Sequence, residues 1–227
     1  MIDIFSYSAF RRAGFRRIGY TVAPALAKFT PSLLRGEAKV AVYVYDTFTD
    51  ADGASLDAHA PDIDLEGGGW SEALADWAIT DNRGHQDNSA ISCAVIDAAA
   101  ADVKISMGGT NTATNPAARE TGVVLRYSDW LNYWVVGWNQ YANSFRISER
   151  VNGTETVRAS SVISGDTAEH TVEAAANGAT IQATYDGVND IAYSSATFNQ
   201  AKTEHGVRCF RRYGDGAYVD EFKVEAP

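Results

Sequence analysis

The sequence predicts an all-β protein built from two antiparallel sheets packed as a sandwich. Through residues 121–225, short runs in which apolar and polar residues alternate follow one another, and this period is typical of strands with one buried face. Helical periodicity is scarce, which favours antiparallel sheets over a parallel α/β arrangement. Dipeptides that accept positive φ, and therefore mark hairpin turns, separate the runs at Asn152-Gly153, Asn177-Gly178, Asp186-Gly187 and Asp215-Gly216.

The earlier elements follow the same pattern. Residues 38–45 alternate, with valines at every second position, and form either the first strand of the body or a connector into it. Further strands are expected over 90–96 and 103–107, before a loop rich in Thr, Asn, Ala and Gly. We therefore divide the chain into an N-terminal arm with its connecting strand, residues 1–45, and a sandwich body, residues 46–227.

Charge distinguishes the arm from the body. The chain of 227 residues has a formal net charge of −10, yet residues 1–45 hold seven basic and two acidic side chains, a charge of +5, which leaves −15 for the rest. An arm of opposite sign is expected to bind a partner, although an ordinary solvated segment would also fit. The candidate partner-binding residues are Arg11, Arg12, Arg16 and Arg17.

Composition excludes several classes of protein. Hydrophobic residues make up 45% and charged residues 21% of the chain, as in a globular domain rather than a disordered one. No apolar run approaches the ~20 residues that span a bilayer, and the N-terminus does not resemble a signal peptide. An acidic body repels phosphates, so we expect no nucleic acid there. Cys93 and Cys209 lie in strand-like runs and are interpreted as buried thiols, with a single disulfide as the alternative.

Several motifs together resemble a known family. The opening Asp46-Thr-Phe-Thr-Asp-x-Asp-Gly with His59-x-Pro61, the central Val124-Leu-Arg-Tyr and Asn132-Tyr-Trp, and the closing Tyr218-Val-Asp-Glu-Phe are similar to concanavalin A-like, laminin-G-like jelly-roll domains. The resemblance covers residues 46–227. It implies a jelly roll whose first and last strands lie close together. Such domains occur in bacterial carbohydrate-binding proteins and in structural proteins of tailed bacteriophages.

The sequence offers no catalytic motif, and we expect no enzyme. Glucanases of the resembled fold carry closely spaced carboxylates on one strand, and this pattern is absent. Glu149 and Glu155 are interpreted as surface-strand residues. The four histidines do not pair at metal-ligand spacing, and no nucleophile elbow or phosphate loop is present.

Calcium and carbohydrate are the candidate ligands. The resemblance places a structural calcium ion near Asp46 and Asp220, while the alternative is that these acids cap turns. Aromatic residues crowd positions 130–141, and exposed indoles stack on sugar rings. The candidate glycan-binding residues are Trp130, Trp138 and Tyr141, with burial of one strand face in the core as the alternative.

These observations give a first hypothesis and two alternatives. The first is a structural component of a bacteriophage particle: a tail, fibre or capsid-decoration subunit that forms a homo-oligomer in the virion and is joined to other virion subunits through residues 1–45. Adhesion of its jelly roll to cell-surface polysaccharide is compatible with this role. The second is a carbohydrate-binding module of an extracellular bacterial protein. The third is a polysaccharide-degrading enzyme.

Overall fold

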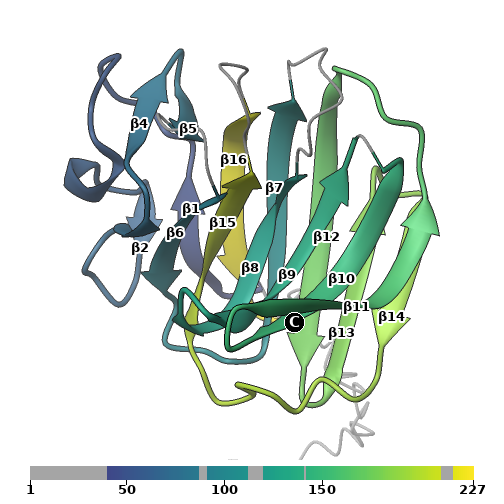
Figure 1. Cartoon of the computed structure of the whole chain (residues 1–227). Coiled ribbons are helices and arrows are strands. Elements are labelled where there is room, and N and C mark those ends of the chain that lie inside the picture. The colour runs from purple at the N-terminus through teal and green to yellow at the C-terminus, as the bar shows by residue number, and fades with distance from the viewer. Residues whose placement is uncertain (1–39, 87–90, 112–119, 141, 211–216) are drawn as a thin grey trace, which may run out of the picture. The chain divides into compact units, whose positions relative to one another are not determined.

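The computed structural model of the chain describes residues 40–86, 91–111, 120–140, 142–210 and 217–227. These residues form two antiparallel β-sheets that pack face to face (Figure 1). In the described part of the chain the only helical segment is one 3₁₀ turn, η1 (Leu56–Ala58), so none of it is a helix long enough to cross a membrane. The all-β prediction is confirmed.

The seven-stranded sheet contains an aromatic-rich strand with Tyr133, Trp134 and Trp138. Its alternating pattern buries the even-numbered positions of residues 134–138 in the core and turns the odd-numbered ones outward. In spatial order the strands are β11 (Thr154–Val162), β10 (Ser144–Val151), β9 (Asn132–Asn139), β8 (Glu120–Asp129), β15 (Glu204–Phe210), β6 (Ile91–Asp97) and β3 (Ser71–Leu74).

The nine-stranded sheet forms the other layer. In spatial order its main path is β14 (Asn189–Tyr193), β13 (Thr180–Tyr185), β12 (Glu169–Asn177), β7 (Val103–Asn111), β16 (Ala217–Glu225), β1 (Val42–Asp46) and β2 (Ile63–Asp64). A hairpin of β4 (Trp77–Thr80) and β5 (Arg83–Gln86) joins this sheet where β5 pairs with β16.

Part of the strand expected over residues 38–45 belongs to the sandwich, as β1. β1 pairs with the last strand, β16, and Asp46 lies opposite Phe222. First and last strands are therefore neighbours, as the resemblance implied. The sandwich thus includes residues that the expected boundary at 45/46 assigned to a connector. The arginines proposed for the arm lie outside the described residues.

The predicted hairpin turns are confirmed where the structure describes them. Both residues of Asn152-Gly153 have positive φ, as do both residues of Asp186-Gly187. Gly178 also has positive φ and joins β12 to β13. These dipeptides set the register of their hairpins because most other residues are sterically strained at positive φ. Asp215-Gly216 lies outside the described residues.

One continuous core fills the space between the sheets. Its largest fully buried apolar side chains come from both layers and from the loop between β1 and β4. Burial of each contributes about 2–3 kcal/mol before conformational entropy is subtracted. The members with the largest volumes are Trp77, Trp134, Trp138, Phe48, Phe145 and Phe222.

Candidate functional site

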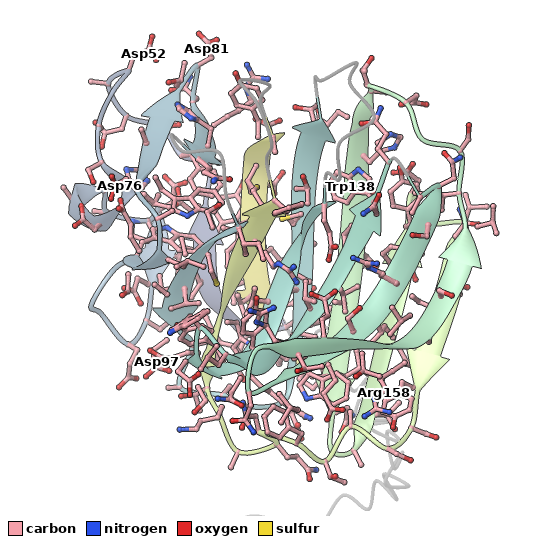
Figure 2. The ribbon with its side chains drawn as sticks, in the orientation of Figure 1. Asp52, Asp76, Asp81, Asp97, Trp138 and Arg158 are labelled. Atoms are coloured by element: carbon pink, nitrogen blue, oxygen red, sulfur yellow. The ribbon has the colours of Figure 1, made fainter. Side chains whose placement is uncertain are left out.

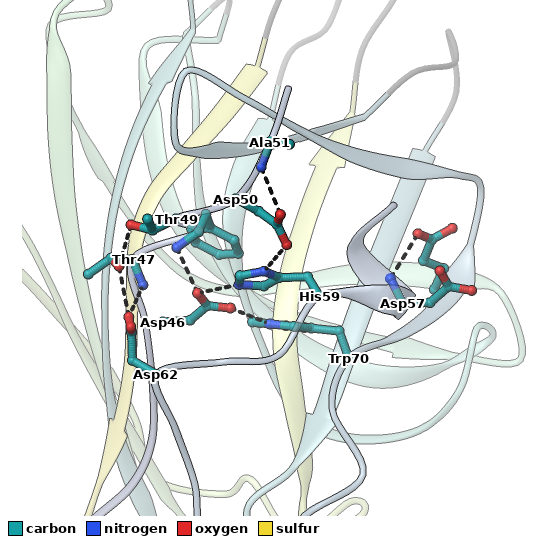
Figure 3. Close-up of polar contacts among 11 residues, drawn as sticks. Asp46, Thr47, Thr49, Asp50, Ala51, Asp57, His59, Asp62 and Trp70 are labelled. Carbon is teal, nitrogen blue, oxygen red and sulfur yellow. Dashed lines mark hydrogen bonds and ion pairs between the residues drawn. The ribbon is translucent and has the colours of Figure 1, made fainter. Parts of the chain in front are cut away.

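A polar network beside β1 holds the following loop in place (Figure 3). The Asp46 carboxylate is fully buried, and its Oδ1 accepts hydrogen bonds from the Phe48 amide at 2.6 Å and from His59 Nε2 at 2.9 Å. Its Oδ2 accepts a hydrogen bond from Trp70 Nε1 at 2.6 Å. The Asp50 carboxylate lies 3.0 Å from His59 Nδ1. Phe48, His59 and Trp70 are thus tied directly to the end of β1, and Asp50 is tied to it through His59.

His59 carries a positive charge more readily than a free histidine. Burial alone would lower its pKa, but the hydrogen bonds to Asp46 and Asp50 outweigh burial and raise it. Both ring nitrogens face carboxylates, so both donate when the ring is protonated. The resulting ion pair compensates the buried charge of Asp46, which is a structural role.

This geometry gives no support to the predicted calcium site at Asp46 and Asp220. The Asp46 oxygens are engaged by three donors, one of them an imidazole that repels a cation when protonated. Asp220 lies in β16 at an irregularity between Val219 and Phe222, on the strand that pairs with β1. Within the described ranges no group of three or more His, Cys, Asp or Glu side chains is placed to hold a metal ion.

The three predicted glycan-binding aromatics have different outcomes. The prediction for Trp138 is wrong, because its side chain is 1% exposed and packs against His170 and Tyr185 between the sheets (Figure 2). A buried indole cannot stack on a sugar at the surface. Trp130, in the turn between β8 and β9, is 48% exposed and stays available. Tyr141 lies outside the described residues.

The outer face of the seven-stranded sheet is concave. Glu155 at the start of β11 and Arg208 on β15 lie four strand positions apart, about 19 Å in a flat sheet. Nevertheless, Arg208 Nη1 donates to Glu155 Oε2 at 2.9 Å. The sheet must therefore curl toward its outer side, and Figure 1 shows the first part of β11 running across the front of the neighbouring strands.

Two arginines and two glutamates line this concavity, and we call them the charged face: Glu120, Arg146, Glu155 and Arg208. Arg146 Nη2 donates to Glu120 and lies 3.4 Å from Glu155 Oε1. Arg208 also lies 3.7 Å from Glu120 Oε1. Arg208 and Glu120 form the floor, at 4% and 2% exposure, whereas Arg146 and Glu155 remain partly accessible.

Mutual pairing keeps Glu155 and Arg208 ionised. Burial alone would raise the pKa of Glu155, but Arg208 and Arg146 outweigh it and hold that pKa below its usual range. Burial alone would lower the pKa of Arg208, and Glu120, Tyr133 and Glu155 raise it instead. Burial raises the pKa of the Tyr133 hydroxyl, beneath the arginines, to about 12. The face therefore presents fixed donors and acceptors at neutral pH.

Two glycines lie between the arginines of the charged face. Gly137 on β9 is opposite Arg146, Gly122 on β8 is opposite Arg208, and the two glycines are opposite each other. A Cβ atom at Gly122 would stand 2.4 Å from the Val136 carbonyl oxygen, and one at Gly137 would stand 2.6 Å from that of Thr121. Glycine permits the close backbone approach here and leaves the middle of the face without side chains.

A rigid corner adjoins the charged face where the β8–β9 and β10–β11 turns meet. The Gly153 amide donates to the Leu131 carbonyl at 3.0 Å, and the Asn152 amide donates to Asn132 Oδ1 at 3.0 Å. Arg150 Nε donates to the Trp130 carbonyl at 3.2 Å. The exposed indole thus stands on a turn whose backbone is fixed by the neighbouring hairpin.

The two cysteines are separate, free and buried. Cys93 packs with the outer cluster of the seven-stranded sheet, while Cys209 packs in the core between the sheets. Burial raises the pKa of each thiol to about 12, so neither is a thiolate at neutral pH. The interpretation as buried thiols is confirmed.

Sequence reasoning missed the charged face. Glu149 and Glu155 were the glutamates it considered, and Glu149 lies within β10, where its carboxylate pairs with Arg158 of the edge strand β11. Glu155 instead belongs to the charged face, whose other members come from three further strands. The only signal in the sequence was the charged residues at outward positions of otherwise apolar strands, which gives no pairing.

Comparison with known proteins identifies the fold but no family. No protein-family model and no curated protein sequence matches the chain. A carbohydrate-binding module, CBM66 from Bacillus subtilis, superposes with a TM-score of 0.51 at 15% identity, covering 69% of this chain and 91% of its own. The carbohydrate recognition domain of Emp47p gives 0.54 at 8% identity, covering 78% of this chain and 96% of its own.

An enzyme also contains the fold as one part. The xyloglucan-locus GH43B protein of Bacteroides ovatus gives a TM-score of 0.56 at 15% identity, covering 81% of this chain. The chain spans only 39% of that enzyme's length. At these identities the likenesses show a concanavalin A-like jelly roll and do not transfer an activity.

Proposed function

We propose that this protein is a carbohydrate-binding module that engages glycan on the concave outer face of its seven-stranded sheet. The observation that carries the proposal is the charged face, where Arg146 and Arg208 are held against Glu120 and Glu155 in a curled sheet. Sugar hydroxyls both donate and accept hydrogen bonds, so a face of fixed charged donors and acceptors matches them. Structural neighbours named for carbohydrate binding support the same choice.

The corner supplies an apolar contact beside the polar face. Trp130 is half-exposed on a fixed turn, and the apolar face of a pyranose covers an indole well. We propose that a glycan lies with one unit on Trp130 and its hydroxyls toward the partly accessible Arg146 and Glu155.

Binding rather than catalysis is our proposal for this face. A glycosidase needs one carboxylic acid with a raised pKa to protonate the leaving group. Arg208 and Arg146 lower the pKa of Glu155 instead. Among the described carboxyls, Glu204 has a raised pKa, through burial and the nearby Asp97, and it belongs to another part of β15. Release of reducing ends that Glu204→Gln abolishes would favour an enzyme.

One further proposal concerns the setting of the module. An extracellular location would suit a glycan-binding role. The virion role expected from the sequence depended on the arm, which lies outside the described residues, and the neighbours named above are carbohydrate-active proteins. We therefore place the carbohydrate-binding function first.

A binding panel with the full chain tests the proposed function. We expect at least one polysaccharide to bind, with Trp130→Ala and Arg146→Gln each weakening binding about tenfold or more. Two substitutions away from the site are the matched controls. Leu65→Ala changes an exposed apolar residue, and Arg158→Gln removes an arginine that pairs with Glu149. No binding across neutral, acidic and amino polysaccharides would refute the proposal, as would equal losses in the controls.

A further inference from the structure

Arg150 differs from almost every other described basic residue because no acidic side chain pairs with it. Seven of the nine described arginines and lysines have a carboxylate within 4 Å. The two without one are Arg150 and Lys202. An arginine without a carboxylate partner is unexpected in this acidic chain, because carboxylates outnumber basic groups.

The nearest cross-strand acid is directed elsewhere. Glu155 lies directly opposite Arg150 in the β10–β11 ladder. Its carboxylate nevertheless reaches across the concavity to Arg208 at 2.9 Å and Arg146 at 3.4 Å. The neighbouring Asp129 accepts hydrogen bonds from Leu131 and Asn132 within its own turn. The carboxylates of Glu155 and Asp129 are thus both engaged by other donors.

The Arg150 guanidinium is nevertheless held in position. Its Nε donates to the Trp130 carbonyl at 3.2 Å, and its Cζ lies 5.8 Å from the centre of the Tyr133 ring. This leaves the two terminal nitrogens, Nη1 and Nη2, without a hydrogen-bond acceptor in the described part of the chain. A guanidinium fixed in this way offers parallel donors that match a carboxylate.

We infer that the corner formed by Trp130 and Arg150 recognises an acidic sugar, such as a uronic or sialic acid residue. The sugar carboxylate would accept hydrogen bonds from Nη1 and Nη2 of Arg150, and the apolar face of the ring would lie on Trp130. The charged face itself is balanced, two arginines against two glutamates, and so offers no net charge to an anion. The inference rests on the proposed function and assigns to it a class of ligand.

Matched pairs of ligands test the inference without altering the protein. Calorimetry would compare 3′-sialyllactose with lactose, and oligogalacturonides with the same oligomers after reduction of their carboxyl groups. We expect the acidic member of at least one pair to bind about tenfold more tightly at low salt, with the preference shrinking as salt is added. Equal affinity within both pairs would overturn the inference and leave the proposed function standing.

Variants of the full chain locate the preference. Arg150→Gln should lower the affinity for the acidic ligand about tenfold more than the affinity for its neutral partner, and so remove the preference. Arg150→Lys keeps the positive charge but loses the paired guanidinium donors, and should retain part of the preference. Lys202→Gln, the other unpaired basic residue, is the control. A preference that survives Arg150→Gln overturns the inference. Failure to bind any glycan refutes the proposed function, and the inference with it.

Discussion

At the scale of single residues, His205 shows how burial fixes the protonation state of a core side chain. Its Nε2 donates to the Ala100 carbonyl at 2.8 Å, and its Nδ1 accepts from the Arg126 amide at 3.2 Å, so the ring is neutral. Burial lowers its pKa to about 4, despite the bond to Ala100. An imidazolium could not accept the Arg126 hydrogen bond.

The consequence is a predicted loss of stability in mild acid. Because the pKa of His205 is lower in the folded chain than in the unfolded chain, the unfolded chain binds a proton at a higher pH. The free energy of unfolding therefore falls as the pH drops from about 6.5 to about 4. The contribution of His205 is about 3 kcal/mol over this window. Urea denaturation of the wild type and His205→Gln across the window measures it. A variant with the same pH slope as the wild type would contradict the prediction.

At the scale of elements, the backbones of β8 and β9 approach closely where Gly122 lies opposite Gly137. We predict that Gly137→Ala costs about 2–3 kcal/mol, because the new Cβ would stand 2.6 Å from the Thr121 carbonyl oxygen and the backbones must separate. Chemical denaturation gives the change in unfolding free energy. Val157→Ala, at a half-exposed position, should stay within about 0.5 kcal/mol. If Gly137→Ala and Val157→Ala lowered the unfolding free energy equally, the prediction would be wrong, because β8 and β9 could then separate without a cost.

At the scale of the whole molecule, the first and last strands of the described sandwich are neighbours. Its first strand begins at Val42 and its last, β16, pairs with both β1 and β7. We predict that deleting residues 1–36 leaves the thermal midpoint within about 2 °C, because no strand of either sheet is removed. If the arm binds other subunits, the deletion should also convert an assembled protein to a monomer in sedimentation. A large fall in the midpoint would place the arm in the core.

The predicted glycan-binding aromatics show where sequence reasoning ends. A period of two places Trp134 and Trp138 on one face of a strand and Tyr133 on the other, but it does not say which face is buried. Trp138 lies in the core because the nine-stranded sheet covers that face. Trp130 could be singled out because it follows Ser128-Asp129 at a turn, where local chemistry alone decides exposure.

The sequence by itself determined the strands, their hairpin turns and the sandwich class, because alternation and turn dipeptides act through neighbouring residues. Only the tertiary structure decided that Glu155 pairs with Arg208 and leaves Arg150 without an acid. This pairing depends on strands that are far apart in sequence and on the direction in which the sheet curls. A short stretch of sequence determines neither of these, so the candidate site could be identified only from the tertiary structure.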